Sequence, residues 1–229
     1  MQPFRLRCYL ASPVALNHPW LHLDGIVAHL VQMRLRGRDY YALPTKVPRP
    51  ASHDFTRHRY QHVLLETDGL THASISWFHP HKLVTIGYYK RFEDQGFPVH
   101  RKKRIESGSG HYRSWMLRWV VVPAEYVDFY GVGDLALLEE LLADLTHLGN
   151  DTRVGWGRVV RWELETLADD RSLVWQGVAM RPIPVRYLAS WSEAVPLAWR
   201  PPYWAAENVD LCAPPGAEVA LRTPRDGGA

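Results

Sequence analysis

The chain has 229 residues, 46% of them hydrophobic, and carries a formal net charge of +3. This length and apolar content predict one large domain, or a domain with an appendage, around a packed core. No apolar run approaches the roughly 20 residues that span a bilayer, and the N-terminus has no signal-peptide pattern, so we expect a soluble cytoplasmic protein.

A strand and a helix are predicted first. Polar and apolar residues alternate from Phe4 to Leu10, as in a strand with one buried face, and the segment continues loosely to Leu16. An Asn-His-Pro-Trp turn at 17–20 precedes the helix. From Leu23 to Leu35, apolar side chains recur at helical spacing, which predicts an amphipathic helix.

The next segment, 37–59, is irregular and basic. Prolines interrupt it and exclude a long helix or strand. Lys46 and Arg49 contribute to its positive charge. Two interpretations stay open: a loop that faces RNA, and a mobile surface loop.

Three strands are predicted after this loop. Residues 62–66 and 73–78 form two apolar runs joined by Asp68-Gly69, a dipeptide typical of hairpin turns. The third strand is predicted from Leu83 to Tyr89.

No set of metal ligands stands out in the sequence. His79 and His81 are two residues apart and have no third ligand at suitable spacing. Cys8 and Cys212 are far apart, which argues against a zinc knuckle or a disulfide framework. We therefore expect neither a metal nor a cofactor.

A compact cationic run, followed by glycines and rings, lies before the next predicted strand. Basic residues, glycines and adjacent rings are typical of a loop that becomes ordered on RNA, although the same composition suits a solvated loop. The residues concerned are Arg101, Lys102, Lys103, Arg104, His111, Tyr112 and Arg113.

A strand from Trp115 to Val122 and a short continuation lead to the strongest helix signal. Asp134 suits an N-cap, because its carboxylate can accept first-turn N–H groups. Leucines then recur at helical spacing, and Gly149 suits a left-handed C-cap. A strand from Val160 to Leu164 comes next.

A glycine-rich loop separates this helix and strand. Gly149, Gly155 and Gly157 leave the backbone bare, and Arg153 and Arg158 add positive charge. Bare N–H groups beside arginines suit a phosphate chain. A tight turn with two solvated arginines is the alternative.

The last part of the chain is predicted to be a strand and an irregular tail. The strand is predicted from Ser172 to Met180. Prolines and tryptophans are frequent in the tail, and prolines argue against long helices. Such a tail can wrap its own core or dock on a partner subunit.

Charge is unevenly distributed along the chain. Residues 1–60 contain nine Lys/Arg and three Asp/Glu, whereas 119–152 contain no Lys or Arg. This segregation indicates a basic face, which is the footprint of a nucleic-acid site. Chance clustering on a solvated surface is the alternative.

Two motifs resemble the RAMP superfamily, the RNA-binding subunits of CRISPR effector complexes in antiviral defence. The pattern LxxLGxxxRxGxGxV at 145–159 resembles the C-terminal glycine-rich loop of these proteins. The segment from Leu21 to Val31 resembles the opening of their first helix. Length and the tryptophan-rich tail look most like the small subunit of type IV complexes that holds the 5′ handle of the guide RNA.

The resemblance implies an α+β fold. An RRM-like (ferredoxin-like) antiparallel sheet would carry helices on one face and would occupy residues 1–170. A basic β-arm, the thumb, would be inserted around 79–113. Residues 171–229 would form a strand and a Pro/Trp-rich extension of the same domain.

The resemblance also implies a non-catalytic RNA-binding subunit that caps the backbone filament. Its partners would be the guide RNA, the repeating backbone subunit and the large subunit, with target DNA contacted indirectly. RNA contacts are expected from Asn17, His18, Trp20, Lys46, Arg49, Arg101, Lys102, Lys103, Arg104, His111, Tyr112, Arg113, Gly149, Asn150, Arg153, Gly155, Trp156, Gly157 and Arg158.

Two other functions stay open. A metal-free endoribonuclease that processes the guide precursor would need a general base and acid, for which His18, His29, His111 and Tyr112 are candidates. A protein-interaction scaffold without nucleic acid would bind its partners regardless of the cationic run.

Overall fold

The computed structural model describes residues 1–37, 62–90, 109 and 113–222. Its centre is a four-stranded antiparallel sheet in the order β5-β8-β1-β9. The strands are β1 (Gln2–Leu10), β5 (Trp77–His79), β8 (Tyr126–Gly133) and β9 (Val159–Thr166). The protein is therefore α+β, as expected.

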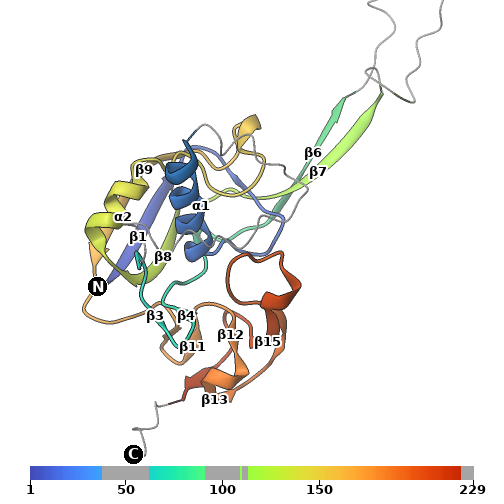
Figure 1. The fold of residues 1–229 in the computed structure, drawn as a ribbon. Coiled ribbons are helices and arrows are strands. Elements are labelled where there is room, and N and C mark those ends of the chain that lie inside the picture. The colour runs from blue at the N-terminus through green and yellow to red at the C-terminus, as the bar shows by residue number, and fades with distance from the viewer. Residues whose placement is uncertain (38–61, 91–108, 110–112, 223–229) are drawn as a thin grey trace, which may run out of the picture.

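Two helices cover one face of this sheet (Figure 1). They are α1 (Leu23–Arg36) and α2 (Leu135–Leu142). Alternate β1 residues such as Phe4 and Leu6 are fully buried against leucines of both helices. The first strand and first helix thus lie where the sequence predicts them.

The central strand β8 differs from the sequence prediction, which places only a short continuation in this segment. Asp128 and two glycines explain the error, because both residue types are poor strand formers. Asp128 is tolerated in this strand because Arg7 on β1 binds its carboxylate through two hydrogen bonds of 2.8 Å. Gly131 is required because a Cβ there would lie 2.5 Å from Cζ of Phe4.

The predicted hairpin at 62–78 is much shorter than expected. The turn at Asp68 and Gly69 is confirmed, and both residues have positive φ. It joins only β3 (Glu66–Thr67) and β4 (Leu70–Thr71). The second predicted strand contributes only β5 to the central sheet, since the residues before it make isolated bridges instead.

The second helix begins as predicted and ends early. Asp134 is the N-cap, and its Oδ1 accepts from the N–H groups of Ala136 and Leu137. The C-cap is Ala143 and not Gly149. Gly149 also has a positive φ, of +81°. Glycine is needed there because a Cβ would lie 2.5 Å from the carbonyl oxygen of Ala15.

A two-stranded arm projects from the body (Figure 1). It consists of β6 (Val84–Lys90) and β7 (Trp115–Val122), which pair along the whole length of β6. The short strand β2 (Val14–Ala15) pairs with the base of β7. Both arm strands agree with the sequence prediction.

The C-terminal extension, residues 171–222, has more regular structure than the expected irregular tail. The predicted strand at 172–180 is a short hairpin, β10 (Val174–Trp175) and β11 (Val178–Ala179), because Gln176 and Gly177 form a positive-φ turn. The other strands form small sheets: β12 (Ile183–Pro184), β13 (Leu188–Trp191), β14 (Val195–Ala198), β15 (Val209–Ala213) and β16 (Val219–Leu221).

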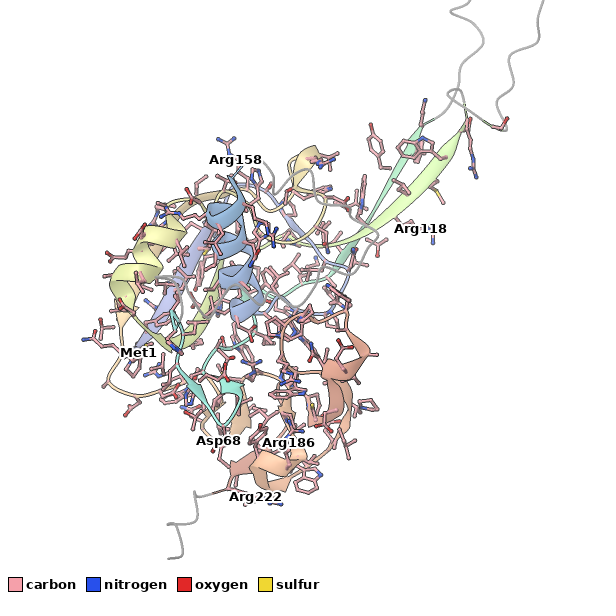
Figure 2. The ribbon with its side chains drawn as sticks, in the orientation of Figure 1. Met1, Asp68, Arg118, Arg158, Arg186 and Arg222 are labelled. Atoms are coloured by element: carbon pink, nitrogen blue, oxygen red, sulfur yellow. The ribbon has the colours of Figure 1, made fainter. Side chains whose placement is uncertain are left out.

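The extension has a hydrophobic cluster of its own. Ile183, Leu188, Trp199 and Cys212 are among its buried members. The β3–β4 turn contacts the extension, since Tyr187 donates a hydrogen bond to the carbonyl oxygen of Asp68; Figure 2 shows Asp68 near the extension that carries Arg186. Neither helix within the described part of the chain is long and apolar enough to cross a membrane.

Candidate nucleic-acid interface

A cleft of about 450 Å³ lies between α1 and the chain that comes after α2. Three segments form its walls: the 17–22 loop with the adjoining part of α1, residues 144–152, and Tyr203 of the C-terminal extension. Asn17, His18 and Trp20 line it from one side, and Gly149 and Asn150 from the other. Two groups of predicted RNA contacts, far apart in sequence, therefore meet at one site.

The glycine-rich loop, residues 149–158, uses much of its backbone within the protein. The N–H groups of Asn150, Val154, Gly155, Gly157 and Arg158 all donate to acceptors in this chain. The sequence suggested that N–H groups of this loop would be free to bind phosphate. These five N–H groups are instead used within the protein. Hydrogen bonds to Ala15, Pro13 and Ser12 instead fasten the loop to the segment after β1.

Close packing explains why glycine occupies position 157. Its φ is +69°, and a Cβ there would lie 1.8 Å from the carbonyl oxygen of Leu148. Gly155 also has a positive φ, of +96°, but an added Cβ would meet nothing within 4 Å. Positive charge on this loop comes from the exposed side chains of Arg153 and Arg158. Figure 2 shows Arg158 at the edge of the body.

Trp156 links the glycine-rich loop to the arm. Its ring packs edge-on against Trp119 of β7, with centroids 6.1 Å apart. Tyr88 of β6 lies 5.7 Å from Trp119 and 5.6 Å from Trp115, so the rings form a continuous row along the arm. The Trp156 Nε1 is buried and has no hydrogen-bond partner among the described residues.

Trp20 belongs to an aromatic wall of the cleft, whose other two members, His22 and Tyr203, the sequence did not indicate. Trp20 donates a 3.0 Å hydrogen bond from Nε1 to Nε2 of His22. The His22 ring stacks on Tyr203, with centroids 3.6 Å apart and planes 13° from parallel. Burial lowers the pKa of His22 to about 4, so this ring is neutral near pH 7. Tyr203 is some 180 positions from His22, and no local pattern connects them.

A buried ionic network holds Tyr203 in place. Arg181 is fully buried and contacts Asp24 on α1 at 3.1 Å. It also donates to the carbonyl oxygens of Thr71 and Ala73 at 2.6 and 3.0 Å. The Tyr203 hydroxyl donates to the other Asp24 oxygen, and burial together with that carboxylate raises the Tyr203 pKa well above its usual value. Tyr203 therefore keeps its proton and its position.

The face of the sheet opposite the helices is occupied by paired charges. Arg7 binds Asp128, and Arg5 contacts Glu165 at 2.5 Å. Arg161 pairs with Glu163 and lies 3.4 Å from the ring centroid of Tyr9. Each of these three arginines thus faces a carboxylate of a neighbouring or the same strand.

The other predicted contacts within the described residues do not line the cleft. Five of them belong to the glycine-rich loop, namely Arg153, Gly155, Trp156, Gly157 and Arg158. Arg113 is exposed at the start of the segment that leads into β7. The remaining predicted contacts lie outside the described residues, namely Lys46, Arg49, Arg101, Lys102, Lys103, Arg104, His111 and Tyr112.

The chain matches the model of one protein family. A family model described as CRISPR type IV associated protein Csf3 matches residues 83–215, which is more than half of the chain. The comparison with curated proteins gives no match. The matched range contains the arm, β8, α2, the glycine-rich loop, β9 and most of the C-terminal extension.

Proposed function

The chain belongs to the family of CRISPR type IV associated protein Csf3, and we propose that it is a non-catalytic RNA-binding subunit of a type IV effector complex. In this proposal it holds the 5′ handle of the guide RNA and caps the filament of repeating backbone subunits. The large subunit is a further partner. The chain contacts target DNA only indirectly, through the guide RNA.

The arrangement of the sheet supports an RRM-like domain. The elements β1, α1, β5, β8, α2 and β9 follow the βαββαβ order of ferredoxin-like folds. In the sheet, β1 and β8 are central and β5 and β9 are at the edges. The β6–β7 arm is inserted between the second and third strands of this unit, and we propose that it is the thumb.

One observation carries the RNA-binding proposal: the 17–20 loop and the glycine-rich loop meet at the cleft. The exposed Arg153 and Arg158 belong to the same glycine-rich loop, although neither lines the cleft. Guanidinium groups on this loop suit an RNA strand, because phosphates provide much of the affinity while bases are bound individually.

The test is binding of a labelled guide RNA to the full chain, with and without its 5′ handle. The handle-bearing RNA is expected to bind more tightly. The double variant Arg153→Gln/Arg158→Gln is expected to lose much of this affinity, whereas Arg161→Gln, which removes one charge from the opposite face of the sheet, is expected to keep it. Equal affinity for both RNAs would contradict the handle proposal.

A metal-free endoribonuclease is the second candidate, because His18 and His29 line the same cleft together with His147. Paired imidazoles are able to act as general base and acid on a 2′-hydroxyl. A denaturing gel of the bound guide precursor distinguishes the two functions. Intact RNA supports the binding subunit, and a discrete product that His18→Ala and His29→Ala abolish supports the nuclease.

A further inference from the structure

We propose that the cleft binds a single nucleobase of the guide RNA, turned out of the strand, while the phosphates on either side remain near Arg153 and Arg158. This inference rests on the proposed RNA-binding function and specifies which part of the RNA binds in the cleft. It adds His22 and Tyr203, which the sequence analysis did not identify, to the RNA site.

The chemistry of the lining suits a nucleobase. Ile26, Leu30 and Met33 of α1 supply an apolar surface on one side of the cleft. Asn17 and Asn150 add amide groups to its lining. A nucleobase has flat apolar faces and polar edges, and proteins bind unstacked bases by combining rings with hydrogen-bonding groups. The volume of about 450 Å³ lies in the range of small-ligand sites.

The electrostatics favour a base over a phosphate in the cleft. Among the described residues that line it there is no Lys or Arg. Its one carboxylate, Asp144, is bound by Arg34. His22 is neutral near pH 7. A neutral base loses little solvation in such a site, whereas an unpaired phosphate would lose much more.

The aromatic wall is held in place by contacts within the protein. Trp20 is hydrogen-bonded to His22, and His22 stacks on Tyr203. Tyr203 lies over Gly25, where an added Cβ would be 3.4 Å from Cε2 of the tyrosine ring. The Asp24 carboxylate fixes the Tyr203 hydroxyl. A preformed wall lowers the entropy cost of ordering side chains on binding.

The alternative aromatic surface, the open face of the sheet, is already covered. RRM domains stack bases on rings of that face. Here Tyr126 lies under the guanidinium of Arg7 at 4.0 Å and stacks with His79 at 4.7 Å. Tyr9 is covered by Arg161. A base would have to displace these contacts, whereas the cleft needs no such displacement.

The experiment is an abasic scan of the 5′ handle, read in the full chain and in three variants. RNAs with one abasic nucleotide at each successive position are titrated against the wild type, Trp20→Ala, Trp204→Ala and Thr146→Trp. Trp204 is next to Tyr203, is 60% exposed and does not line the cleft, which makes it the matched control. Thr146 is exposed, lines the cleft and is not a core residue, so Thr146→Trp is expected to fill the cleft and leave the core unchanged.

One handle position is expected to lose roughly five- to a hundredfold in affinity when its base is absent. That loss should disappear in Trp20→Ala and in Thr146→Trp, because the base no longer has its site, and should persist in Trp204→Ala. Penalties that are identical in all four proteins would overturn the base-binding cleft and leave the RNA-binding function standing. Absence of binding to every RNA would overturn both. If Trp20→Ala does not fold, the comparison of Thr146→Trp with the wild type still shows whether the penalty for the missing base depends on the cleft.

Discussion

Tyr203 in the C-terminal extension donates a hydrogen bond to Asp24 in the first turn of α1, and Arg181 binds the same carboxylate. Tyr203 and Asp24 are far apart in sequence, and their contact joins the extension to the sheet domain at the wall of the cleft. The extension is therefore a structural part of the candidate RNA site.

The buried ion pair should be essential for stability. Arg181→Met leaves the Asp24 carboxylate buried without its cation, and we expect a loss of about 3–5 kcal/mol in the free energy of unfolding. Urea unfolding followed by circular dichroism measures it. Arg186→Met is the matched control, because its pair with Asp210 is exposed, and should cost less than about 1 kcal/mol. Equal losses in the two variants would refute the role assigned to the network.

The Tyr203 hydroxyl should contribute separately from its ring. Tyr203→Phe keeps the stack on His22 and removes the donor to Asp24, so a loss of roughly 1–3 kcal/mol in unfolding free energy is expected. Handle binding by the folded variant should be nearly unchanged. A variant as stable as the wild type would show that the hydrogen bond carries no net stabilisation.

The two glycines of the loop should respond differently to alanine. Gly157→Ala combines a left-handed backbone with a clash against Leu148, and a loss of roughly 2–5 kcal/mol is expected. Gly155→Ala meets only the backbone penalty, about 1–2 kcal/mol. Thermal unfolding compares them. Similar costs for both substitutions would mean that close packing at position 157 is not what requires glycine.

Stability should depend on pH through Asp170. Burial raises the pKa of its carboxyl, but hydrogen bonds from His72 and Ser172 together outweigh burial, and the net shift is downward. A lowered pKa in the folded state stabilises the protein above the unfolded value, near 4, and the stabilisation is lost as the pH falls through the folded-state pKa. Asp170→Asn should therefore be less stable than the wild type at pH 7, and the difference should shrink toward pH 3. A difference that does not change with pH would contradict this linkage.

Local patterns predicted the elements whose signals are local. The alternation of β1, the apolar spacing of α1 and the capping by Asp134 each depend on neighbours in sequence, and each agrees with the structure. Strand β8 was missed because its stability comes from partners on β1, which allow Asp128 and Gly131 in a central strand.

The site could be predicted only in part for the same reason. Asn17, Trp20 and Asn150 belong to recognisable loops, and they line the cleft. Tyr203 and Arg181 lie in a proline-rich segment without a motif, and their role depends on a fold-level contact with Asp24. The glycine pattern marked a loop that partly lines the cleft, but Gly149 and Gly157 are required by close packing against neighbouring backbone.

The salt dependence of guide-RNA binding tests most directly whether Arg153 and Arg158 hold the RNA. The logarithm of the binding constant falls linearly with the logarithm of salt concentration when phosphates are neutralised by arginines. We expect a steep slope for the wild type and a slope shallower by about two for Arg153→Gln/Arg158→Gln, roughly one for each phosphate contact. A slope that is the same in the double variant and the wild type would contradict the claim that these arginines hold the RNA.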